Sequence, residues 1–131
     1  MPARRVIATG GAPAAIGPYS QGIAAGGFVF TAGQIALDPA SGQLVGATAA
    51  EQTRRALANA LAVVEAAGGR PADVVKATVY LVDMGEFAAV NAVYKEFFAA
   101  DPPARTVVAV GGLPRDARVV IELVASVPDG C

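Results

Sequence analysis

Two charged side chains interrupt apolar runs near the end of the chain, and both belong to types that can do chemistry. Arg105 opens an apolar run that follows a pair of prolines, and Glu122 lies between Val120 and Val124 on one face of a predicted strand. A guanidinium can bind a carboxylate through two parallel hydrogen bonds, and a carboxylate can accept a proton from water. A carboxylate flanked by valines must lie at a subunit interface, pair with a cation or line a pocket, because an unpaired buried charge costs several kcal/mol. We therefore expect Arg105 to be the partner or neighbour of Glu122, either in a structural ion pair or in a functional site.

Three further residues are candidates for a site, and each also has an ordinary structural explanation. Asn91 lies on the apolar stripe of a predicted helix, four residues after Phe87 and three before Tyr94, so its amide needs partners and either braces a neighbouring segment or serves a site. Tyr19 lies in a loop rich in proline and small residues, where its ring either anchors the loop or lines a pocket. Gly33 marks a strand end, a bulge or a close approach of the backbone to a ligand.

Composition excludes several classes of function. The sequence has no histidine, which excludes histidine-based acid–base and nucleophilic catalysis and the usual zinc sites, so we predict no metal site. A single cysteine, Cys131, has no partner for an intrachain disulfide. A net charge of −1 and a pI near 5.3 give no basic field for nucleic acid or an anionic membrane. No glycine motif of a nucleotide-binding loop is present.

Length and hydropathy indicate one soluble domain that buries part of its surface against other subunits. The 131 residues fit a single domain, 1–131, with no repeats and no linker. No apolar run reaches the ~18 residues that a membrane span needs, and no signal-peptide core follows the first residues, which predicts a cytoplasmic protein. Hydrophobic residues make up 54% and charged residues only 16% of the chain, an apolar excess that favours a subunit interface.

The hydrophobic pattern predicts an α+β fold. We expect six strands, at residues 4–8, 22–25, 28–32, 74–82, 105–110 and 118–127. A first helix is expected over 49–67, with Thr48 and Glu51 in a capping box, and a second helix follows Asp83, with Glu86 at the same spacing. This order favours one mixed sheet with both helices on a single face, which leaves an apolar face for other subunits.

Four segments then identify a family that the chain resembles. They read AAIGPYSQG at 14–22, TAGQI at 31–35, NAVYKEFF at 91–98, and PAR at 103–105 continuing through LP to IE at 121–122. In this order and spacing they resemble the RidA (YjgF/YER057c/UK114) family of reactive-intermediate deaminases, and the resemblance covers nearly the whole chain.

The resemblance implies a chorismate-mutase-like fold, assembled as a homotrimer with three active sites in clefts between subunits. It implies the hydrolysis of 2-imino and enamino acids, such as 2-aminoacrylate, to 2-oxo acids and ammonia, the activity of a 2-iminobutanoate/2-iminopropanoate deaminase. No cofactor is implied, and the expected partners are the small imino acid and further copies of the chain.

The resemblance also assigns roles to residues of this chain. Arg105 matches the arginine that holds the substrate carboxylate, and Glu122 matches the glutamate that orients and activates water. Tyr19 matches a tyrosine of the cleft, Gly33 a glycine whose backbone approaches the ligand, and Asn91 an asparagine near the site.

Two positions depart from the family pattern. Ala32 stands where many members have serine, and Val107 stands where many have cysteine or serine, so a hydroxyl or thiol is missing at both. The backbone groups of Val107 remain available to a substrate, so the departures bear on the range of substrates rather than on the reaction.

The main alternative is a non-catalytic trimer that uses the same cleft to bind small carboxylates such as 2-oxo acids, or that makes regulatory or chaperone-like contacts. Arg105 suits both functions equally. Glu122 favours the hydrolase, because a receptor for carboxylates gains little from a second anion, whereas water activation needs a base. A ribonuclease ranks third, because the chain is acidic and has no histidine.

Overall fold

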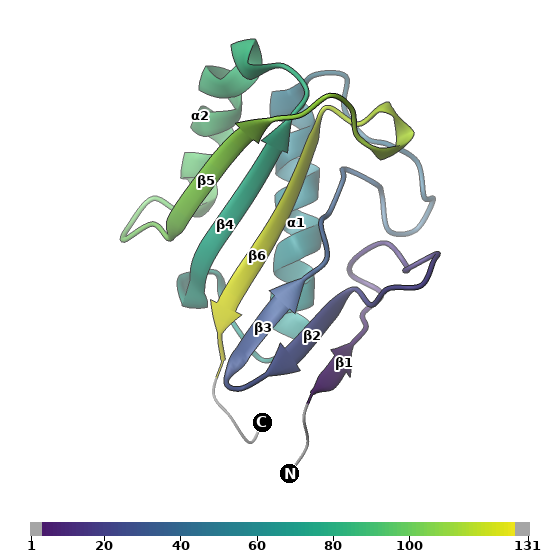
Figure 1. The fold of residues 1–131 in the computed structure, drawn as a ribbon, viewed down its shortest axis with the longest axis vertical. Coiled ribbons are helices and arrows are strands. Elements are labelled where there is room, and N and C mark those ends of the chain that lie inside the picture. Colours follow the sequence, from purple (N-terminus) through teal and green to yellow (C-terminus); the bar gives the residue numbers. More distant parts are fainter. Residues whose placement is uncertain (1–3, 128–131) are drawn as a thin grey trace.

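The computed structural model describes residues 4–127 and shows a six-stranded sheet with two helices behind it (Figure 1). The strands lie in the order β1-β2-β3-β6-β4-β5, and only β4 and β5 are parallel. The strands are β1 (Arg5–Ile7), β2 (Gly22–Ala25), β3 (Phe28–Thr31), β4 (Val74–Leu81), β5 (Ala104–Ala109) and β6 (Val119–Ser126). The helices are α1 (Ala49–Ala66) and α2 (Phe87–Phe97), with single 3₁₀ turns at Pro71–Asp73, Met84–Glu86 and Pro114–Asp116.

The predicted fold class is confirmed, with a mixed sheet and both helices on one face. Each strand and the first helix end within one residue of the predicted bounds. The turn between β2 and β3 consists of Gly26 and Gly27, with φ of 61° and 83°, a left-handed pair that glycine adopts without steric cost. The predicted absence of a disulfide concerns Cys131, which lies outside the described residues.

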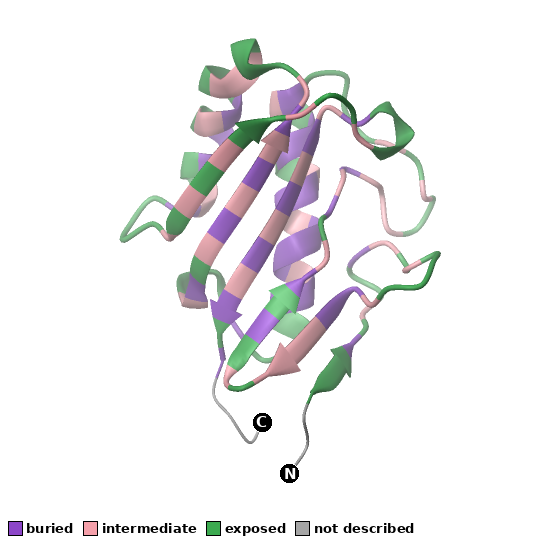
Figure 2. Ribbon diagram, viewed as in Figure 1, coloured by how far each residue is buried: buried purple, intermediate pink, exposed green. Residues whose placement is uncertain are grey.

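Alternation of side chains along the strands separates a buried face from an open one. On β6 the residues that face the helices are fully buried, whereas Val120, Glu122 and Val124 face the other side and are half-buried. Figure 2 shows this alternation as stripes along β4 and β6. Among the described residues, no helix covers this second face, and large apolar side chains such as Phe30 stay exposed there.

Helix α1 begins with the capping box that the sequence predicts. The Thr48 hydroxyl accepts a hydrogen bond from the Glu51 backbone amide at 3.1 Å, and the Glu51 carboxylate accepts one from the Thr48 amide at 3.1 Å. Gly68, with φ of 96°, ends the helix in the left-handed region. Both ends of α1 are therefore set by local sequence.

The start of α2 differs from the prediction of a second capping box. Asp83 accepts a hydrogen bond from the amide of Gly85 at 2.8 Å and begins a 3₁₀ turn, which tightens the backbone. The Glu86 carboxylate does not cap this helix. It accepts a hydrogen bond from the Ala49 amide at the start of α1, at 2.9 Å, and it forms a charge-assisted hydrogen bond with the guanidinium of Arg118. Glu86 thus connects the 3₁₀ turn before α2 with the start of α1 and with Arg118, the residue before β6.

The Glu86 contacts predict a stability that depends on pH. The Arg118 guanidinium, and next the Ala49 amide, hold the pKa of Glu86 below its ordinary value of 4.5. A carboxyl whose pKa is lower in the folded state stabilises the fold above its unfolded-state pKa, and this stability is lost as the pH falls through the folded-state pKa. We expect Glu86→Gln to lower the free energy of unfolding by about 1 to 2 kcal/mol at neutral pH, and the difference to shrink below about pH 4.5.

Urea unfolding of both proteins between about pH 7 and about pH 3 measures this difference. Glu65→Gln, on the exposed side of α1, is the matched control and should show no such trend. A Glu86→Gln difference that stays constant over the whole pH range contradicts the assigned role.

Candidate functional site

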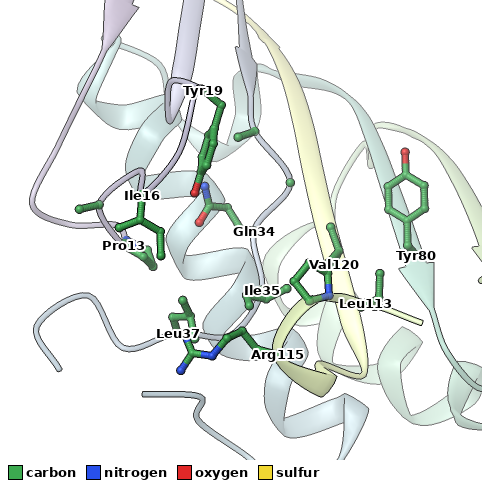
Figure 3. A pocket seen from close by; sticks show the side chains of 14 residues that line it. Pro13, Ile16, Tyr19, Gln34, Ile35, Leu37, Tyr80, Leu113, Arg115 and Val120 are labelled. Carbon is green, nitrogen blue, oxygen red and sulfur yellow. The ribbon is translucent and has the colours of Figure 1, made fainter. Parts of the chain in front are cut away.

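A hollow of about 710 Å³ opens at one end of the helix-free face, where three loops meet β4 and β6 (Figure 3). Its lining is mostly apolar, and Arg115 is the one charged residue among the described residues that form it. The residues that line it are Pro13, Ala14, Ile16, Tyr19, Ala32, Gly33, Gln34, Ile35, Leu37, Tyr80, Leu113, Pro114, Arg115 and Val120. Two predicted site residues, Tyr19 and Gly33, are among them.

Two buried amide side chains hold the loops that form this hollow. Gln21 donates to the carbonyl of Pro13 at 2.7 Å, and Asn59 of α1 donates to the carbonyls of Ile35 and Leu37 at 3.1 and 2.9 Å. These hydrogen bonds satisfy loop carbonyls that have no strand partner. The hollow therefore has a fixed frame in the single chain.

Gly33 lets its loop pass close to β6. A Cβ at this position would lie 2.8 Å from Cγ1 of Val120, and the next residue, Gln34, donates its amide to the carbonyl of Ile121 at 2.8 Å. β3 ends at Thr31, just before Gly33, which agrees with the strand end, and the close neighbour that the structure shows at Gly33 is β6; the approach to a ligand stays a prediction. Tyr19 is 53% exposed and lines the hollow, and Figure 3 shows it among the lining side chains with Gln34 and Ile16.

Arg105 lies on the opposite side of the sheet, against α2. Its Nη1 donates to Oδ1 of Asn91 at 2.7 Å, and its guanidinium carbon lies 5.5 Å from the ring centroid of Phe87 and 4.7 Å from that of Tyr94. Asn91 lies on the apolar stripe of α2, and Arg105 is the partner that its amide was predicted to need. No ion pair to Arg105 is present within residues 4–127, so its charge is not neutralised there.

Glu122 faces the helix-free side, beyond Val120 on β6. Its Oε1 accepts a hydrogen bond from the hydroxyl of Tyr80 at 3.3 Å. Burial, and next the charge of Glu122, raise the pKa of Tyr80, so its hydroxyl remains a hydrogen-bond donor at neutral pH. Within the described residues, the neighbour that binds Glu122 is therefore the phenol of Tyr80 and not the cation that the sequence predicted.

The expectation that Arg105 neighbours Glu122 is wrong within one chain. Arg105 pairs across the sheet with Ala77 of β4, and Glu122 pairs with the next residue, Thr78. Successive residues of a strand point to opposite faces, so the two charged side chains point to opposite faces as well.

The candidate residues therefore form two groups, which we call the helix-side half-site and the open-face half-site. Val107 shares the face of Arg105, and its side chain packs against the core. The helix-side half-site comprises Arg105, Asn91 and Val107, and the open-face half-site comprises Glu122, Tyr80, Tyr19 and Gly33.

Sequence reasoning missed three residues of this arrangement. Gln21 follows directly after the Pro18-Tyr19-Ser20 loop, and Asn59 stands three residues after Ala56 and four before Val63, on the apolar face of the first helix. Tyr80 lies on the same strand face as Thr78, which pairs with Glu122. For Asn59 the clue was a polar side chain on an apolar helix face, whereas Gln21 lies in a loop and Tyr80 alternates with the buried Val79 and Leu81, so periodicity indicated neither of them.

Two further classes of site, a metal cluster and a membrane-spanning helix, are absent from the described part of the chain. No group of three or more histidine, cysteine, aspartate or glutamate side chains that could hold a metal ion occurs there. None of its helices is both long enough and apolar enough to cross a membrane.

The sheet order, the helix pair and the open hollow together define a protein of the YjgF-like α+β class. The family model described as Endoribonuclease L-PSP matches residues 9–127. A RutC family protein from Pyrococcus horikoshii is 50% identical over 122 residues, which cover 93% of this chain and 97% of the relative. The chain therefore belongs to the RidA (YjgF/YER057c/UK114) family.

Other relatives carry more specific names. A protein from Homo sapiens named 2-iminobutanoate/2-iminopropanoate deaminase is 46% identical over 122 residues, 93% of this chain and 89% of the relative. The crystal structure of E. coli TdcF with bound serine superposes with a TM-score of 0.90 at 42% identity and covers 95% of this chain and 99% of that chain.

The Arg105–Asn91 contact can be tested by its effect on stability. We expect Asn91→Leu to lower the free energy of unfolding by about 1 to 2 kcal/mol, because it leaves a half-buried guanidinium without its acceptor. Asn91→Asp keeps the oxygen acceptor and should retain most of the stability. Urea unfolding at one protein concentration measures both variants.

A double-mutant cycle with Arg105→Ala separates this contact from packing. In the Arg105→Ala background, Asn91→Leu should lower the free energy of unfolding much less, because no guanidinium is then present to lose its acceptor. Equal costs in the two backgrounds contradict the pairing.

Proposed function

We propose that the chain hydrolyses 2-imino acids and their enamine forms, such as 2-aminoacrylate, to 2-oxo acids and ammonia without a cofactor. The observation that carries this proposal is the environment of Arg105. Its guanidinium is held by a neutral amide oxygen of Asn91 at 2.7 Å and rests on two aromatic rings, so its position is fixed while its charge is left for an anion. A carboxylate is the anion that every 2-imino acid carries.

The comparisons support this proposal. Relatives at 46% and 48% identity from Homo sapiens and E. coli are named 2-iminobutanoate/2-iminopropanoate deaminase. E. coli TdcF was crystallised with serine, an amino acid that carries a carboxylate.

We further propose that the active site forms between chains of a homotrimer. Arg105 and Glu122 face opposite sides of one sheet, so a single chain offers each half-site without the other. The exposed apolar side chains of the helix-free face and the low content of charged residues, 16%, favour burial of that face against other copies. The helix-side half-site of one chain would then meet the open-face half-site of its neighbour.

In the proposed mechanism, Arg105 pairs with the substrate carboxylate and fixes the imine carbon beside a water molecule at Glu122. Glu122 accepts a proton from the water molecule as the water oxygen attacks the carbon of the protonated imine, which gives a neutral tetrahedral carbinolamine. Glu122 returns this proton to the amine, the carbon–nitrogen bond breaks, and the hydroxyl proton passes to the departing ammonia, which leaves as ammonium while the carbonyl of the 2-oxo acid forms. One water is consumed and no electron is gained or lost.

The remaining residues would position the substrate. Asn91 orients Arg105, the Tyr19 ring covers the hollow, and the backbone at Gly33 passes close to the ligand. Val107 would contribute only backbone groups, because its side chain packs against the core. A rate gain of about 10² to 10⁴, or about 3 to 6 kcal/mol, is sufficient, since imines also hydrolyse in plain water.

An imine-trapping assay tests this function. An amino-acid oxidase generates the imino acid, semicarbazide traps it, and an active protein lowers the semicarbazone signal relative to a reaction without it. We expect Arg105→Ala and Glu122→Gln each to reduce this effect by about 10²-fold or more, because one loses substrate positioning and the other the base.

Arg54→Ala is the matched control, since it removes an exposed arginine that pairs with Glu96 on the surface, and it should keep full activity. Wild-type protein that binds 2-oxo acids but leaves the semicarbazone signal unchanged for several imino acids would favour the carboxylate-binding alternative over the hydrolase.

Mixing two inactive variants tests where the site forms. If Arg105 and Glu122 act from neighbouring chains, refolding Arg105→Ala together with Glu122→Gln in equal amounts should restore about a quarter of the wild-type activity, because one site in four then holds both intact residues. Either variant refolded alone is the control. A mixture that stays inactive while it assembles normally indicates that both residues act from the same chain.

A further inference from the structure

We propose that the hydroxyl of Tyr80 is a positioning group that holds the carboxylate of Glu122 for the activation of water. This inference rests on the proposed function, and it adds a residue that neither the family resemblance nor the names of the relatives assign.

The register of β4 and β6 brings the two side chains together. Glu122 pairs with Thr78 and Val120 pairs with Tyr80, so Tyr80 and Glu122 are diagonal neighbours on the same face. Diagonal neighbours on adjacent strands lie within reach of aromatic and other long side chains. The Tyr80 hydroxyl accordingly lies 3.3 Å from Oε1 of Glu122.

Glu122 has few other groups to hold it. Its neighbours on the same strand face, Val120 and Val124, offer no hydrogen bond. Lys76, on the same face of β4, donates its Nζ to the Thr106 hydroxyl at 2.8 Å and forms no ion pair with Glu122. Within residues 4–127 the Tyr80 hydroxyl is the one hydrogen-bond donor that the structure gives to this carboxylate.

One donor on one oxygen is the arrangement that a water-activating carboxylate needs. The hydrogen bond to Oε1 restricts the rotation of a side chain with three flexible torsions and leaves Oε2 to accept a proton from water. A tyrosine hydroxyl is ordinarily protonated at neutral pH, and burial and the charge of Glu122 raise the pKa of Tyr80 further, so it donates and does not compete as a base.

Tyr80 also connects Glu122 with the hollow. It lines the hollow together with Tyr19 and Gly33, and Figure 3 shows it across Val120 from the group around Tyr19. A shift of the Tyr80 side chain would therefore move a wall of the hollow and the carboxylate together.

Removal of the hydroxyl alone tests this role. Tyr80→Phe keeps the ring, and we expect kcat for 2-imino acid hydrolysis to fall about threefold to tenfold with KM unchanged, because carboxylate binding at Arg105 is untouched. In the Glu122→Gln background the same change should have no further effect on the residual rate, because the activated carboxylate is already absent.

Thr106→Val is the matched control. It removes a hydroxyl from the same sheet face, one that accepts from Lys76 and does not contact Glu122, and it should leave kcat unchanged. Size exclusion and thermal unfolding establish that the variants fold and assemble like the wild type.

The outcomes separate the inference from the proposed function. Wild-type protein that accelerates no imine hydrolysis overturns the proposed function and this inference with it. If the wild type is active and Tyr80→Phe has the same kcat, the positioning role alone is overturned. If Tyr80→Phe lowers kcat by the same factor in the wild type and in the Glu122→Gln background, the positioning role is also overturned, because the hydroxyl would then act through another group.

Discussion

The alternation of side chains across the sheet is the constraint on which the site depends. Arg105 and Glu122 pair with consecutive residues of β4, so the same register that buries the core directs the two charges to opposite faces. Had they met, each would have neutralised the other, and the guanidinium would have offered less to an anionic ligand. Separation keeps both charges available: the cation against aromatic rings and an amide, and the anion beside a phenol.

The sequence predicted those features that local periodicity determines. The bounds of the strands, the capping box of α1 and the glycine turn between β2 and β3 all depend on residues within a few positions of each other. The predicted contact between Arg105 and Glu122 is wrong within one chain because it depends on which strands are neighbours and in which register, and β4, which precedes both residues in the sequence, determines both. Asn91 shows the intermediate case: its position on the apolar stripe predicted a need for a partner, and only the fold identified Arg105.

The hollow depends on neutral side chains. Gln21 and Asn59 are buried and bind loop carbonyls that lack strand partners. An amide supplies these hydrogen bonds without the desolvation cost of a charge, and it adds no field to a hollow whose lining is apolar. Among the described residues, the charged side chain that lines the hollow is Arg115, so the electrostatic environment of an occupant depends chiefly on this guanidinium.

The departures at Ala32 and Val107 bear on which substrates the proposed site would accept. A serine at position 32 would add a hydroxyl donor and acceptor to the mostly apolar lining of the hollow, and alanine leaves that part of the wall apolar. Val107 lies on the other side of the sheet, on the face of Arg105, and its side chain packs against the core. Both replacements remove a polar side chain while Arg105 and Glu122 are kept, so they would favour apolar over polar substituents on a bound imino acid.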